Sequence, residues 1–142
     1  MKYLSFALLI AFLTLGGCCR DDCYQLVDLA FRVVDQNGRD LVLTLDVPVD
    51  SIQVTTASGT RLHLFQVFAE PAYLIVGFTS GEDKLILSYD HRQTTLNITT
   101  KVIDKSRCCG DAHGIDTLEA SSGAVTTETT PNGKATIYVI KL

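Results

Sequence analysis

The chain contains no tryptophan, so any sugar-binding surface would depend on its tyrosine and phenylalanine side chains as aromatic platforms. Most of the aromatic residues beyond residue 18 fall inside strand-like patterns, where we expect them to fill a core. Phe65 and Phe68 flank such a pattern and are expected to be partly exposed. They give only weak support for a binding face, and glycan recognition is not the favoured interpretation.

No apolar run in the sequence is long enough to cross a membrane as a helix, which takes roughly 20 residues. The longest run extends from Tyr3 to Leu15 and follows the basic residue Lys2. This arrangement is typical of the apolar core of a secretory signal peptide. Small residues follow at Gly16 and Gly17, where an extended chain would fit a peptidase cleft. We therefore predict that residues 1–17 are a signal peptide.

The residue after this segment is a cysteine, and Leu15-Gly16-Gly17-Cys18 is the pattern of a bacterial lipoprotein signal. The thiol of Cys18 would carry a diacylglycerol, and the freed amine a further acyl chain such as palmitate. Two or more acyl chains together give stable anchoring. The sequence thus predicts a lipidated tether over residues 18–23 that attaches the protein to a membrane it does not span. The alternative is an ordinary secretory signal that is cleaved nearby.

Positive charge is scarce in the predicted mature chain. Residues 1–17 hold one of the twelve basic residues and none of the sixteen acidic ones, so the remainder carries a formal charge of −5. Nucleic acids and anionic lipid surfaces are bound mainly through clustered lysine and arginine. The charge balance therefore argues against a nucleic-acid partner. The acidic residues are scattered, so they indicate no basic partner either.

Recognised catalytic motifs are also missing: the sequence has no HExxH, GxSxG or P-loop pattern. Of the three histidines, His63 falls on the polar face of a strand pattern, His91 in a turn and His113 in a cysteine-containing loop. The segment from Asp35 to Asp40 resembles a calcium loop, but Arg39 and Asp40 occupy places that need Asp or Asn and Gly. We assign no catalytic residue, metal ligand or cofactor.

What the mature chain does contain is isoleucine, valine, leucine and threonine in short runs separated by turn signals, a composition that favours strands. The Asn37-Gly38 pair predicts a type I′ hairpin turn. Two polar segments, 105–114 and Ser121–Gly133, are expected to be loops. Strands are predicted at Tyr24–Val34, Asp40–Asp46, Ser51–Ala57, Thr60–Phe68, Ala72–Phe78, Lys84–Tyr89, Thr94–Asp104, Ile115–Ala120 and Lys134–Lys141.

Eight or nine short strands at spacings of about ten residues are typical of a β-sandwich. The predicted fold class is therefore all-β, with a single β-sandwich domain over residues 24–142. An immunoglobulin-like or transthyretin-like sandwich is the first choice, and a small β-barrel is the alternative. Within this fold we predict that Ala72–Phe78, a nearly continuous apolar run, is buried on both faces.

Four cysteines remain once Cys18 is assigned to the lipid: Cys19, Cys23, Cys108 and Cys109. In an exported domain they are candidates for disulfides. A direct Cys108–Cys109 bridge would be strained, so we expect Cys23 to pair with one of these two. Free thiols are a second interpretation. A third is a metal or thiol site built from the four cysteines and His113, although the usual CxxC spacing is absent.

The chain resembles the small cell-envelope lipoproteins of the Bacteroidota. The resemblance rests on Leu15–Cys18, on Arg20-Asp21-Asp22, on the Val33–Leu41 segment and on Cys108-Cys109-Gly110, about a fifth of the chain. Cys19 departs from the small polar residue that is commoner after the lipidated cysteine. The resemblance implies a lipid-anchored protein of the outer membrane and transfers no active site. It also implies outward display, through the charged residues 20–22.

The sequence therefore predicts a non-enzymatic, membrane-anchored envelope lipoprotein that serves as a binding or accessory module, with an envelope protein as candidate partner. The oligomeric state and the ligand are left open. The alternative function is a thiol- or metal-dependent enzyme or redox protein that uses Cys19, Cys23, Cys108, Cys109 and His113.

Overall fold

A computed structural model describes residues 26–41, 51–106, 110–130 and 132–142. These residues form nine strands, and the all-β fold class is confirmed. The strands are β1 (Leu26–Val34), β2 (Ile52–Thr56), β3 (Leu64–Val67), β4 (Tyr73–Thr79), β5 (Lys84–Tyr89), β6 (Arg92–Ser106), β7 (Gly110–Ala120), β8 (Ala124–Thr129) and β9 (Thr136–Lys141).

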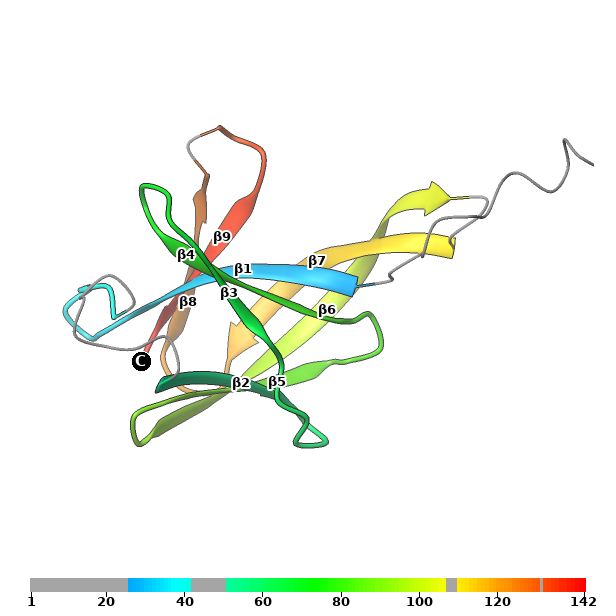
Figure 1. The fold of residues 1–142 in the computed structure, drawn as a ribbon. Coiled ribbons are helices and arrows are strands. Elements are labelled where there is room, and N and C mark those ends of the chain that lie inside the picture. Colours follow the sequence, from blue (N-terminus) through cyan, green and yellow to red (C-terminus); the bar gives the residue numbers. More distant parts are fainter. Residues whose placement is uncertain (1–25, 42–50, 107–109, 131) are drawn as a thin grey trace, which may run out of the picture.

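The strands make two sheets that pack against each other as a sandwich (Figure 1). One sheet has the order β3-β4-β1-β9-β8, and the other has the order β2-β5-β6-β7. The neighbouring strands pair antiparallel, except that β1 and β9 run parallel. The described strands do not close into a barrel, so the β-barrel alternative is wrong.

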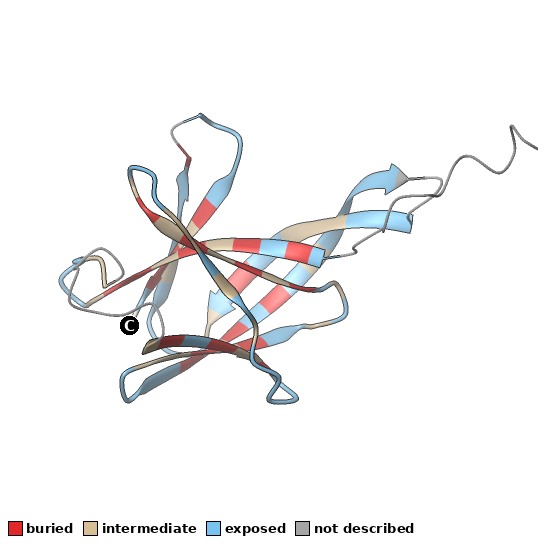
Figure 2. Cartoon of the chain, in the orientation of Figure 1, coloured by how far each residue is buried: buried red, intermediate tan, exposed pale blue. Residues whose placement is uncertain are grey.

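Buried residues alternate with more exposed ones along strands of both sheets (Figure 2), and their side chains form one core. Every second residue of β1 from Val27 to Val33 is buried, and so is every second residue of β4 from Leu74 to Phe78. In the opposite sheet Leu85, Leu87 and Leu96 are fully buried. Burying one such side chain contributes roughly 1.5–3 kcal/mol, so this shared core is the main source of stability.

The turn after β1 differs from the predicted type I′ hairpin. Only Gly38 has a positive φ, +80°. The N–H of Gly38 donates to the carbonyl of Asp35, and the N–H of Asp35 donates to the carbonyl of Arg39. This is a turn followed by a glycine bulge, a common longer hairpin loop. Beyond it Asp40 forms one isolated bridge with Val34, and residues 42–46 of the predicted Asp40–Asp46 strand lie outside the described residues.

Both predicted loops contain strand residues, so these two predictions are wrong. β6 continues to Ser106 and β7 begins at Gly110, which makes a long β-ribbon of most of segment 105–114. His113 thus lies in β7, opposite Val102. The Ser121–Gly133 segment contains β8, which pairs with β9 over all six of its residues. Its threonines suit a strand, but a mostly exposed strand shows no apolar alternation in its sequence.

Two further predictions need correction. The Thr60–Phe68 segment is strand only from Leu64 to Val67, because the N–H of Leu62 donates to Val54 in the opposite sheet before the chain crosses over. The apolar strand β4 is not buried on both faces: its outward residues Tyr73 and Ile75 are only half-buried. The prediction for Phe65 and Phe68 is confirmed, since these side chains are 58% and 86% exposed.

Candidate functional site

The cysteines predicted to carry a lipid or form disulfides, Cys18, Cys19, Cys23, Cys108 and Cys109, lie outside the described residues. Their assignments therefore stay predictions.

His113, the remaining member of the predicted cysteine–histidine cluster, is half-buried in β7. Its Nδ1 atom is buried, and no hydrogen-bond partner for it is seen among the described residues. His63 and His91 are exposed and lie far apart in the sequence, and the ring of His63 packs edge-on against Phe65 with the centroids 4.6 Å apart.

The described residues form an open groove of about 710 Å³. This volume falls within the range of small-molecule sites, roughly 300–1,000 Å³. Four chain segments converge on it: the turn after β1, the start of β6, the β7–β8 turn and the end of β9. The groove is lined by Gln36, Arg92, Gln93, Ser122, Gly123, Ala124, Lys141 and Leu142.

A buried threonine fixes the β7–β8 turn that forms one wall of the groove. The hydroxyl of Thr94 donates to the carbonyl of Ser122 over 3.0 Å, and the N–H of Ser122 donates back to that hydroxyl over 3.2 Å. Beside it, the N–H of Thr95 donates to the hydroxyl of Ser121. Thr94 is only 1% exposed, so these contacts hold the turn to β6 in a protected environment.

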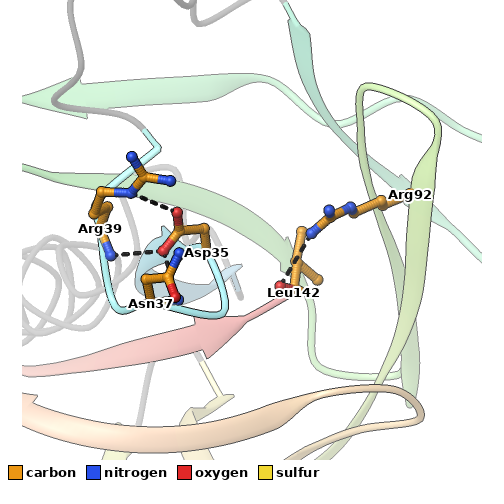
Figure 3. A network of polar contacts seen from close by, with 5 residues as sticks. All are labelled: Asp35, Asn37, Arg39, Arg92 and Leu142. Atoms are coloured by element: carbon orange, nitrogen blue, oxygen red, sulfur yellow. Dashed lines mark hydrogen bonds and ion pairs between the residues drawn. The ribbon is translucent and has the colours of Figure 1, made fainter.

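The carboxylate of Asp35 organises the turn that carries Gln36 (Figure 3). It accepts hydrogen bonds from the N–H groups of Asn37 and Arg39 and from Nε of Arg39, each at 2.8 Å. The hydrogen bond from the Arg39 N–H is the largest cause that lowers the pKa of Asp35 below its usual value. The negative charge of the Asp35 carboxylate is therefore paired with donors of its own turn.

Two cationic side chains, Arg92 and Lys141, line the groove. Nη1 of Arg92 donates to the main-chain oxygen of Leu142 over 3.2 Å, which joins β6 to the end of β9 (Figure 3). The N–H of Leu142 in turn donates to the carbonyl of Val34, so the end of β9 is tied to β1 as well. The lining contains no aspartate or glutamate among the residues described.

A second, smaller hollow of about 310 Å³ lies over β5, β6 and β7. Asp83, Lys84 and Glu119 are part of its lining, so it carries mixed charge and a net negative balance. Because its lining carries charges of both signs, this hollow would not select a partner by charge.

Sequence reasoning did not find the groove. Its residues come from turns and strand ends that are remote in sequence, and none belongs to a motif. The one local signal was the turn composition at Asp35–Gly38. The exposed Phe65 and Phe68, which the sequence singled out, lie outside the groove lining.

Comparison with family models, curated proteins and solved structures finds no match for this chain. In the part of the chain that the structure describes, no helix has the length and apolar character needed to span a membrane. Across those same residues, histidine, cysteine and acidic side chains form no cluster of three or more that could hold a metal ion.

Proposed function

We propose that this chain is a non-enzymatic bacterial envelope lipoprotein that is anchored to the outer membrane through Cys18 and binds an envelope partner in the groove. The observation that carries the binding role is the groove itself, an open concavity built from four hydrogen-bonded segments. The anchor is supported by the Leu15–Cys18 pattern.

The direction of β1 bears on where the groove lies relative to the proposed anchor. The proposed anchor precedes the start of β1 at Leu26, whereas Gln36 in the groove lining follows its end at Val34. Nine residues of strand extend over about 30 Å. A chain held at its N-terminal end would therefore present the groove on the side away from the membrane, where a partner can reach it.

The anchor is tested by expressing the full chain in a bacterial host with lipoprotein processing. We expect the wild-type protein to enter the detergent phase on Triton X-114 partition, and its mass to correspond to residues 18–142 plus acyl chains. Cys18→Ala should abolish both properties, because it removes the acceptor thiol. Cys19→Ala is the matched control and should keep both. Anchoring that survives in Cys18→Ala would contradict the proposal.

The binding role is tested in the same cells with a photo-crosslinking residue at Ser122 in the groove or at Ala57 in the exposed turn after β2. The proposal predicts a discrete crosslinked species from position 122 that position 57 does not give. Identical patterns at the two positions would mean that the groove is not a binding site.

A further inference from the structure

Two turns of the chain contain the same dipeptide, Asn-Gly. Asn37-Gly38 lies in the turn after β1, and Asn132-Gly133 lies in the turn between β8 and β9. Both asparagines are exposed, and a basic residue follows each pair. In this dipeptide the asparagine side chain reacts most readily with the main chain, because glycine has no Cβ to block the approach. The chain therefore holds two candidate sites of spontaneous deamidation.

Deamidation needs no reactant other than water. The main-chain nitrogen of the glycine loses its proton to solvent and attacks Cγ of the asparagine. A bond forms between these two atoms, the bond from Cγ to Nδ2 breaks, and the side-chain nitrogen leaves as ammonia. Water then opens the cyclic imide at either of its carbonyls. The products are aspartate and isoaspartate, and in isoaspartate the main chain runs through Cγ. An amide and water thus become a carboxyl group and ammonia, and nothing is oxidised or reduced.

The two glycines have similar surroundings. Both have a positive φ, and a Cβ atom at Gly38 or Gly133 would meet no other atom within 4 Å. The N–H of Gly38 donates to the carbonyl of Asp35 over 3.0 Å, and the N–H of Gly133 donates to the carbonyl of Thr130 over 2.7 Å. Each attacking nitrogen must therefore leave one turn hydrogen bond, and the glycines alone do not separate the two sites.

The asparagine side chains differ. Oδ1 of Asn132 accepts a hydrogen bond from the hydroxyl of Thr130 over 2.7 Å and another from the N–H of Lys134 over 3.2 Å. Thr130 is only 7% exposed, so its contact is shielded from water. In the other turn the carboxylate of Asp35 accepts from the main-chain N–H of Asn37 (Figure 3), and no hydrogen bond of the Asn37 carboxamide is seen among the described residues. The Asn37 carboxamide can therefore rotate toward the next nitrogen without first losing a partner.

From these observations we propose that Asn37 is a site of spontaneous deamidation in the folded protein and that the β8–β9 turn protects Asn132. Deamidation alters a wall of the groove, because Gln36 lines the groove and directly precedes Asn37. Aspartate at this position adds a negative charge close to that of Asp35. Isoaspartate lengthens the main chain inside the turn that the hydrogen bond between Asp35 and Arg39 closes. The inference goes beyond the proposed function and does not depend on it.

The test incubates the purified full chain in a mildly alkaline buffer with a non-ionic detergent and follows both sites by peptide mass spectrometry. We expect Asn37 to react roughly tenfold faster than Asn132, because two hydrogen bonds hold the Asn132 carboxamide. Labelling with an isoaspartate methyltransferase detects the isoaspartate product. Asn37→Gln is the matched control: its longer side chain closes the ring poorly, so modification at position 37 should stop while the rate at Asn132 stays the same.

Two further comparisons separate the effect of the fold from that of the local sequence. In denaturing urea both asparagines should react at similar rates, because each keeps its glycine and loses its hydrogen bonds. In the folded protein Thr130→Val should speed the reaction at Asn132 and leave that at Asn37 unchanged, since the donating hydroxyl is removed. Thr130→Ser keeps this hydroxyl and should behave like the wild type. Circular dichroism checks that both variants fold, and the comparison in urea decides if Thr130→Val does not.

Equal rates at the two sites of the folded protein, or a faster reaction at Asn132, would overturn the inference. So would a difference that persists unchanged in urea, because the local sequence would then be its cause. If the urea sample reacts while Asn37 in the folded protein does not, the turn after β1 protects its asparagine as well, and the inference is wrong. Lipidation of Cys18 and the crosslink at position 122 test the proposed function separately, so the two proposals fail independently.

Discussion

At the scale of single residues, Arg32 makes two ion pairs within the five-stranded sheet. Its Nε lies 2.7 Å from Oδ2 of Asp40, and its Nη1 lies 2.7 Å from Oε2 of Glu128. Burial acts to lower the pKa of Arg32, but the hydrogen bonds and charges of Asp40 and Glu128 outweigh it and raise that pKa. Arg32 thereby joins β1 to the turn after it and to β8.

We predict that Arg32→Gln lowers the free energy of unfolding by about 1–3 kcal/mol, because charged hydrogen bonds are lost at a side chain that is only 15% exposed. Urea denaturation measures this loss. Arg39→Gln is the control: it breaks an ion pair of similar length, but the Arg39 side chain is 72% exposed and water replaces the contact. Equal losses in the two variants would show that burial of Arg32 is unimportant.

At the scale of elements, the β7–β8 turn is held closely against β9 at Gly123. Gly123 has a φ of +92°, and a Cβ atom at this position would clash with the main-chain oxygen of Lys141. A side chain here would therefore force the turn away from β9. The turn between β8 and β9 offers a comparison, since Gly133 has a φ of +70° but a Cβ atom there would meet no other atom within 4 Å.

We predict that Gly133→Ala costs only the backbone strain of a left-handed residue, about 1–2 kcal/mol. Gly123→Ala should cost clearly more, because the clash with Lys141 adds to the same strain. Urea denaturation of the two variants separates the backbone strain from the clash with Lys141. If both variants lose the same stability, the contact between Gly123 and β9 is looser than the structure indicates.

At the scale of the whole molecule, the start of β1 and the free end of the β6–β7 ribbon lie on the same side (Figure 1). Cys23 precedes Leu26 by three residues, and Cys108 and Cys109 connect β6 to β7 in the sequence. The disulfide between Cys23 and the late pair stays a prediction, because these cysteines lie outside the described residues. In the chain-entropy model, closing a loop of more than 80 residues stabilises a protein by up to about 4.7 kcal/mol.

We predict that residues 20–142, alkylated without reductant, gain one adduct in an intact-mass measurement. One bridge would leave one of the three thiols free. Cys23→Ser should then gain two adducts, because it releases the partner of Cys23. No adduct in Cys23→Ser would instead identify a Cys108–Cys109 bridge. Three adducts in the unmodified sequence would contradict the disulfide and favour the thiol-dependent alternative.

The fold class was predictable because strand periodicity is local. Val27 to Val33 alternate in burial as their sequence indicates, and a face of apolar side chains must pack on another. The two wrong loop predictions share a cause. Residues 110–114 and β8 have polar sequences, and their strand structure comes from hydrogen bonding to β6 and β9 rather than from burial of their side chains.

The sequence by itself determined the all-β class, the alternating core and the exposure of Phe65 and Phe68, because each depends on residues close together in the chain. It also carries the lipoprotein pattern at Leu15–Cys18, which is a linear signal. Only the tertiary structure decided the strand order, the parallel pairing of β1 with β9 and the groove. The groove brings Gln36, Arg92 and Lys141 together from segments that are distant in the sequence. Their proximity depends on how the two sheets pack.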